Sequence, residues 1–301
     1  MSHGKMHADE VDIDAALVGR LVAAQFPQWA ALPVTPVRSA GTDNAMYRLG
    51  EDMVVRLPRV PGAAGQVAKE QRWLPLLAPH LPLDLPVPLG EGVPGEGFGM
   101  PWSVYRWLEG GDAHDEPPAD PADAATGLGR FVAALRRVDA TGGPRSFRGG
   151  PLAGRDDDVR AAIRELGADG TVDADTATAA WEEALGLPQW EDAPVWVHGD
   201  LLPGNLLVRG GRISAVIDFG TVGVGDPACD MLPAWTLLTS ANRDRFRDAA
   251  GADDGTWARG RGWALCFGLT AHRYYRVTNP VLAGIGGRAV SEALADFRRA
   301  A

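Results

Sequence analysis

A histidine, an asparagine and two aspartates lie among apolar residues in the stretch VWVHGDLLPGNLLVRGGRISAVIDFG, residues 195–220. These four side chains are His198, Asp200, Asn205 and Asp218. Burying a neutral polar group without a partner costs roughly 2–7 kcal/mol, and burying a charge costs more. Some other polar group or a ligand must therefore compensate them.

The local pattern places these side chains on a loop and at a strand end, where polar groups can converge. The β-prone runs VWV and NLLV flank the loop HGDLLPG, and ISAVID predicts a further strand that ends at Asp218. Two carboxylates and an amide in such a place could bind Mg²⁺ and orient a hydroxyl for attack on a phosphoryl group. The alternative is that Asp200 and Asp218 are turn-forming residues next to strands.

HGDLLPGN resembles the catalytic loop of the aminoglycoside phosphotransferases, a small-molecule branch of the protein-kinase-like fold, and IDFG resembles their metal-binding segment. The kinase pattern H-R-D-x-x-x-x-N followed by D-F-G has the same separation of Asp from Asn. The resemblance covers roughly residues 35–240. It implies that Asp200 accepts or orients the proton of the substrate hydroxyl and that Asn205 and Asp218 hold Mg²⁺. By the same resemblance His198 would organise the loop.

The nucleotide-binding part of the chain departs from the kinase pattern at its cation. In a kinase, a lysine on the third strand pairs with a glutamate of the following helix. Here the third predicted strand reads MVVRLP, and Arg56 is its only cation. Glu70 falls on the apolar face of the next predicted helix, where a carboxylate needs a partner. We expect Arg56 and Glu70 to pair and to bind nucleotide; otherwise they are a surface arginine and a solvated glutamate.

The turn SAGTDNAMY is expected to cover the phosphates of the nucleotide. It has one glycine where a protein kinase would have three, but Ser39, Thr42 and backbone N–H groups could contact phosphate.

Other residues near these motifs are expected to be structural. Asp226 and Asp230 of GDPACD, which resembles the family's next landmark, should cap a helix and brace a loop. The aromatic residues Trp102, Tyr105 and Trp107 are expected to pack in a core, and no functional role is assigned to them.

The amino-terminal third of the chain reads as strands and turns with two helices. A helical pattern opens the chain, and a second helix is expected over residues 63–81, where Pro75 should kink it or begin its second part. Three short strands joined by two hairpins are expected in residues 34–58, and further strands in PVPLGEG and PWSVYRWLEG.

After a Gly-, Pro- and Asp-rich hinge the chain reads mainly as helix. Asp120 followed by Pro121 predicts a helix start, and helical patterns recur at 155–168, at 173–186 and after 227. The sequence thus predicts an α+β, protein-kinase-like fold of two lobes. Residues 1–107 would be a small β-rich nucleotide-binding lobe, and residues 108–301 a mainly helical lobe with the catalytic loop and the acceptor site.

Composition limits the remaining possibilities. A chain of 301 residues with 46% hydrophobic and 23% charged residues is typical of a soluble globular protein. The amino terminus lacks an apolar signal, and no run approaches the ~20 apolar residues of a membrane span, so we expect a cytoplasmic protein without a membrane partner. The two distant cysteines, Cys229 and Cys266, are expected to be reduced core thiols.

The net charge of −10 argues against nucleic acid as a partner and tilts slightly toward a cationic small-molecule substrate. Our first hypothesis is a kinase that moves the γ-phosphate of ATP or GTP to a hydroxyl of an aminoglycoside-type antibiotic, which would confer resistance. The same chemistry could act on a macrolide, choline, another amino alcohol or a sugar. A nucleotide-binding pseudokinase is a further alternative, motivated by Arg56, but the complete set Asp200, Asn205 and Asp218 argues against it.

Overall fold

The computed structural model describes residues 11–37 and 43–300. Its internal contacts divide the chain into two units. The first contains the described residues up to Pro79, together with Asp84–Gly110 and Ala215–Gly220; the second contains the rest. The expected boundary near residue 108 lies close to this division. The sequence did not indicate that residues 215–220, which include Asp218, group with the first unit.

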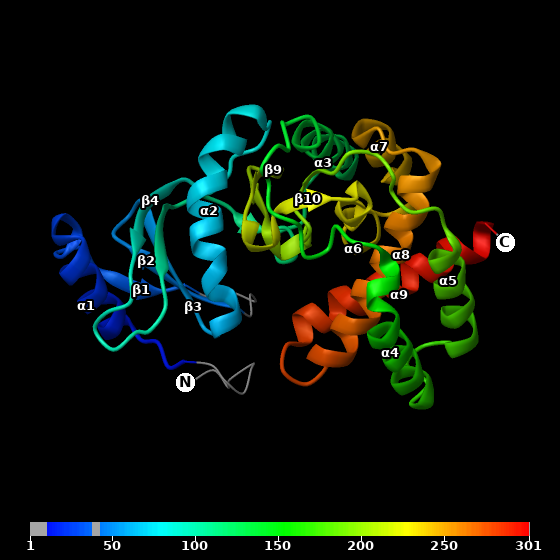
Figure 1. Cartoon of the computed structure of the whole chain (residues 1–301), viewed down its shortest axis with the longest axis horizontal. Coiled ribbons are helices and arrows are strands. Elements are labelled where there is room, and N and C mark those ends of the chain that lie inside the picture. Colours follow the sequence, from blue (N-terminus) through cyan, green and yellow to red (C-terminus); the bar gives the residue numbers. More distant parts are fainter. Residues whose placement is uncertain (1–10, 38–42, 301) are drawn as a thin grey trace. The chain divides into compact units, whose positions relative to one another are not determined.

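An antiparallel sheet forms the centre of the first unit (Figure 1). Within the described residues its strand order is β1-β2-β3-β5-β4. The register pairs Arg56 with Met46 of β2 and with Ser103 of β5. The bounds of the strands are β1 Val34–Pro36, β2 Asn44–Leu49, β3 Met53–Pro58, β4 Pro88–Gly92 and β5 Trp102–Arg106.

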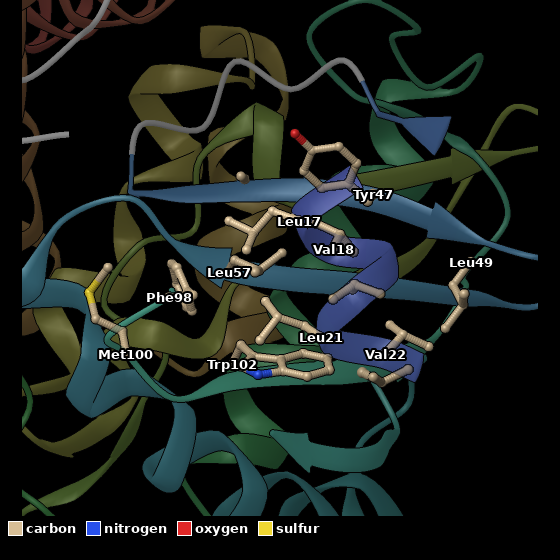
Figure 2. Packing of buried hydrophobic residues seen from close by; sticks show 13 residues of the cluster. Leu17, Val18, Leu21, Val22, Tyr47, Leu49, Leu57, Phe98, Met100 and Trp102 are labelled. Atoms are coloured by element: carbon tan, nitrogen blue, oxygen red, sulfur yellow. The ribbon is translucent and has the colours of Figure 1, made fainter. Parts of the chain in front are cut away.

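Helix α1 (Ala15–Gln25) covers one face of this sheet. It begins after Asp14, whose carboxylate accepts the N–H of Leu17 at 2.7 Å and so satisfies one free donor of the first turn. Figure 2 shows its buried side chains together with Leu57 of β3 and Trp102 of β5. The alternation of apolar residues along the strands thus places one half of each strand in this core.

Helix α2 (Ala64–Leu77) lies on the other face, because the alternate strand residues reach it. Gln71 of α2 donates to Ser103 of β5 at 3.1 Å, and Glu70 bonds Arg56 of β3. The helix continues through Pro75 to Leu77, so the proline does not begin a separate helix.

The second unit is mainly helical. Asp120 accepts the N–H groups of Ala122 and Asp123, and Pro121 follows it, so the predicted start of the helix is confirmed. The bounds of its helices are α3 Pro121–Leu135, α4 Asp156–Ala168, α5 Ala174–Gly186, α6 Pro233–Thr236, α7 Ser240–Ala250, α8 Asp254–Tyr275 and α9 Pro280–Ala300. Helices α8 and α9 pack together so closely that a Cβ on Gly268 would lie 2.7 Å from the carbonyl oxygen of Gly286.

Short strands interrupt these helices, and three of them coincide with the predicted runs VWV, NLLV and ISAVID. β7 (Val195–Val197) pairs with β10 (Gly223–Gly225), and β8 (Leu206–Arg209) lies between β6 (Gly111–Asp112) and β9 (Arg212–Val216). These strands fix both ends of the loop that carries His198 and Asp200. Cys229 and Cys266 are free and buried, as predicted. No helix in residues 11–37 and 43–300 combines the length and apolarity needed to cross a membrane.

Candidate active site

A tight turn after β7 carries Asp200. Gly199 has φ 78°, a left-handed conformation that favours glycine, and a Cβ there would lie 3.1 Å from Ser146 Oγ. The Thr221 hydroxyl donates to the carbonyl oxygen of His198 at 2.7 Å. The glycine between His198 and Asp200 is therefore required both by the backbone and by its neighbours.

The buried carboxylate of Asp230 braces this turn. It accepts the N–H groups of His198 at 2.8 Å and of Gly199 at 2.7 Å from the 3-10 helix η7 (Pro227–Met231). Burial raises the pKa of Asp230 to about 7, although the two N–H groups act in the opposite direction. Asp226 caps the same helix by accepting the N–H of Ala228 at 3.0 Å. The predicted bracing and capping roles of these two aspartates are thus confirmed.

The loop itself brings three of the predicted residues together. His198 is fully buried, and its Nδ1 accepts the N–H of Asp200 at 3.1 Å. The 3-10 helix η5 (Pro203–Asn205) turns the chain back, so that Asn205 Nδ2 donates to the carbonyl oxygen of Asp200 at 2.8 Å and to its Oδ2 at 3.1 Å. The number of residues between Asp200 and Asn205 is therefore the number that this turn needs to bring the two side chains together.

Arg148 also contacts Asp200, and sequence reasoning missed it. Its Nη1 donates to the carbonyl oxygen of Gly199 at 2.8 Å and to Asp200 Oδ1. Burial would lower the pKa of Arg148, but the Asp200 carboxylate raises it above its usual value. Arg148 comes from an irregular loop far from Asp200 in sequence, so no periodicity could have indicated the contact.

In the first unit, the expected pair of Arg56 and Glu70 is observed. Arg56 Nη1 donates to both oxygens of Glu70, at 2.6 and 2.5 Å, and Nη2 donates to Asp218 Oδ1 at 2.5 Å. Burial alone would lower the pKa of Arg56, but the carboxylates of Asp218 and Glu70 raise it. One guanidinium thus neutralises part of the charge of two carboxylates.

Tyr105 belongs to the same cluster, although the sequence suggested core packing alone. Its hydroxyl donates to Glu70 Oε2, and burial followed by the charge of Glu70 raises the pKa of Tyr105. The signal that could have revealed this contact is the alternation along β5, which puts Tyr105 on the face of Ser103 and of Arg56.

Asp218 has a backbone conformation that is uncommon for a residue with a side chain. Its φ of 60° lies in the left-handed region, and such a conformation costs of order 1–3 kcal/mol. A Cβ on Gly220 would lie 2.5 Å from Gln66 Oε1, so the segment packs tightly on α2. The Asp218 side chain is nevertheless 38% exposed, which leaves it accessible to a ligand. Ser39 and Thr42 lie outside the described residues.

Asn205 in the second unit and Asp218 in the first each offer side-chain oxygen atoms, the ligand type that Mg²⁺ prefers. Asn205 uses Nδ2 to hold Asp200, and within residues 11–37 and 43–300 its Oδ1 accepts no hydrogen bond. No group of three or more His, Cys, Asp or Glu able to hold a metal is found among these residues.

A sequence model described as "Phosphotransferase enzyme family" matches residues 34–263, which include the polar clusters of both units. The chain belongs to the phosphotransferase enzyme family. The family supports a kinase-type enzyme, and the resemblance recognised in the catalytic loop is confirmed. No curated protein matches this phosphotransferase in sequence.

Solved structures confirm the α+β, protein-kinase-like fold of this phosphotransferase. A GDP complex of a mutant aminoglycoside 2'-phosphotransferase-IIIa has a TM-score of 0.75 and 20% identity, and the match covers 95% of this chain and 99% of that one. The apoenzyme of macrolide 2'-phosphotransferase MphH from Brachybacterium faecium has a TM-score of 0.60 and 26% identity, and the match covers 92% of this chain and 97% of that one. ADP-bound aminoglycoside phosphotransferase APH(2'')-Ib has a TM-score of 0.59 and 17% identity, and the match covers 94% of this chain and 97% of that one.

Proposed function

We propose that this phosphotransferase moves the γ-phosphate of ATP or GTP to a hydroxyl of a small molecule. The observation that carries the proposal is the Asp200 carboxylate, held by Asn205 on a glycine turn that Asp230 braces. In the reaction, the acceptor oxygen forms a bond to the γ-phosphorus as the bond to the β–γ bridging oxygen breaks. The nucleoside diphosphate leaves, and Asp200 accepts or orients the proton of the hydroxyl.

The first unit would bind the nucleotide. Arg56 contacts a phosphate oxygen, and Glu70 holds the guanidinium in place, because its fork can bridge a carboxylate and a phosphate. Ser39 and Thr42 are proposed to contact phosphate as well. Asn205 and Asp218 would hold Mg²⁺, which when bound would neutralise charge that develops on the phosphates. GDP and ADP in two of the similar structures support a purine nucleotide as donor.

The leading acceptor is an aminoglycoside-type antibiotic, with resistance as the outcome, and a macrolide is the alternative. Both choices extend the sequence-based hypotheses and are supported by the names of the similar structures. A metabolite such as choline or a sugar would require no change in the chemistry. The acidic net charge supports a small-molecule partner rather than nucleic acid, and the composition supports a cytoplasmic enzyme without a membrane partner.

A nucleotide-consumption screen of the purified full chain tests this function. ATP and GTP are each combined with Mg²⁺ and a panel of hydroxyl-bearing antibiotics and metabolites. We expect consumption that depends on one acceptor class, and the same mixture with Asp200→Asn serves as the control. Bound nucleotide without acceptor-dependent turnover across the panel would contradict the proposal and support a pseudokinase.

A further inference from the structure

The loop between α3 and α4 is locally cationic in an acidic chain. Residues 136–155 contain five arginines, among them Arg148 and Arg155, and one acidic residue, Asp139, whereas the whole chain has a net charge of −10. Phe147 of this loop is 64% exposed, and the Arg155 guanidinium lies 4.3 Å from the centroid of its ring. A loop of this composition suits a ligand that carries oxygen atoms and apolar surface better than it suits a polycation.

This loop is tied directly to Asp200. Arg148 uses its Nη1 for both the carbonyl oxygen of Gly199 and Asp200 Oδ1. Among the described residues, no group accepts a hydrogen bond from Arg148 Nε or Nη2, and the Arg148 side chain is 22% exposed. A guanidinium has five N–H donors, so Arg148 keeps donors for a ligand that approaches Asp200. Asp200 itself is 20% exposed and can accept a further hydrogen bond.

We propose that Arg148 is a specificity-determining residue, which selects acceptors whose reacting hydroxyl is flanked by neutral or anionic oxygen groups instead of protonated amines. The inference rests on the proposed function, because it takes Asp200 as the group that faces the acceptor hydroxyl. A protonated amine beside that hydroxyl would be held close to the Arg148 guanidinium, and like charges in contact disfavour binding. A hydroxyl, carbonyl or carboxylate oxygen in the same place would accept from Nη2 or Nε.

The local charge at Arg148 therefore opposes the weak preference for cations that the net charge suggests. Long-range attraction by an acidic protein affects the rate of encounter, whereas the guanidinium acts on the bound acceptor. Among the acceptor classes proposed above, the inference therefore ranks sugars, and antibiotics without protonated amines around the reacting hydroxyl, ahead of unmodified aminoglycosides.

The test compares an aminoglycoside with its fully N-acetylated derivative, which keeps the hydroxyls but carries no ammonium groups. The ratio of kcat/KM for the two acceptors is measured with the full chain and the better of MgATP and MgGTP. We expect wild type to favour the acetylated compound by at least about tenfold, the effect of one like-charge contact. Arg148→Met should abolish most of this ratio, and Arg148→Lys, which keeps the charge, should retain it.

Arg160→Met is the matched control, because Arg160 of α4 also pairs with an aspartate, Asp156, at 2.8 Å, and its second ion-pair partner is Glu182 rather than Asp200. Its ratio should equal that of wild type. The inference would be overturned if wild type had the higher kcat/KM for the unmodified aminoglycoside. It would also be overturned if folded Arg148→Met had the same ratio of kcat/KM for the two acceptors as wild type. If Arg148→Met does not fold, the ratios of wild type and Arg148→Lys decide.

The same assay separates failure of the inference from failure of the function. Nucleotide consumption with protonated amines only would overturn the role of Arg148 and leave the phosphotransfer intact. No consumption with any acceptor would overturn the proposed function and the inference with it.

Discussion

Each unit of the molecule contains an arginine bound to an aspartate, but the two pairs differ in charge and surroundings. Arg56 lies between two carboxylates, Glu70 and Asp218, so its cluster keeps a net negative charge. Arg148 has one carboxylate partner, Asp200, so that pair is neutral. The Mg²⁺ ion of a metal–nucleotide complex would be attracted to the carboxylates of the first arrangement, whereas the second can orient a carboxylate without attracting a cation. Substitutions in the two pairs should therefore affect different steps.

The largest expected effect is on Asp200. Asp200→Asn should lower turnover by at least about 10²-fold, the low end of general-base contributions, because an amide cannot accept the proton. Nucleotide binding should stay within a few-fold of wild type, since the Arg56 cluster is untouched. Steady-state kcat and nucleotide titration measure the two quantities. Retained turnover would remove the distinction between the two pairs.

Asp218→Ala should mainly weaken binding of the Mg–nucleotide complex, whereas Asp200→Asn should mainly lower turnover. Asp218→Ala removes a carboxylate proposed to hold Mg²⁺ and leaves Arg56 bonded to Glu70 and Gln66, so the Mg–nucleotide complex itself should weaken. Asn205→Ala should behave similarly but less severely. The measurement is Mg²⁺ titration at fixed nucleotide, and curves that overlay those of wild type would show that Asp218 has no metal role.

The Arg56 cluster should behave as a unit. Arg56→Ala and Glu70→Ala should each impair nucleotide use, and the double variant should be little worse than either, because contacting residues show coupling of about 0.5–3 kcal/mol. Arg56→Lys should be partly active, since one ammonium cannot form the same paired hydrogen bonds. The measurement is kcat/KM for nucleotide in the four variants and wild type. Full additivity with an active Arg56→Ala would mean that phosphate is neutralised elsewhere.

The smallest effect should come from the brace behind Asp200. The pKa of Asp230 is raised from 3.8 to about 7, so the folded chain binds a proton between these values that the unfolded chain has released. Its contribution to stability is complete below pH ~4 and is lost as the pH rises through about 7. Asp230→Asn should therefore flatten the pH dependence of the free energy of unfolding by up to about 1.4 kcal/mol per pH unit in this range.

Urea unfolding from pH 5 to 8 measures this difference between wild type and Asp230→Asn. Parallel curves would show that Asp230 does not change its protonation on folding. Asp248→Asn, on the exposed side of α7, provides the control for the loss of one carboxylate.

The local sequence was sufficient to predict the main helices and strands, and it predicted some of the residue contacts in the polar cluster of each unit. Asp120 and Pro121 predicted a helix start that the structure has, because capping depends on neighbouring residues. Alternation along β3 put Arg56 on the face of Glu70, and the turn from Asp200 to Asn205 is encoded by its own glycine and proline. Such features follow from backbone geometry within a few residues, which a sequence displays directly.

Only the tertiary structure assigned Arg148 to Asp200, Tyr105 to Glu70, and residues 215–220 to the first unit. Arg148 lies in an irregular loop, where no period relates a side chain to a face, and its partner is far away in the chain. Core packing was expected for Tyr105 because an aromatic ring in a strand usually packs in a core. Its hydroxyl finds Glu70 as a partner only because α2 covers the face of the sheet on which Tyr105 lies. The sequence determined which side chains could do the chemistry, and long-range packing decided which charges stand beside them.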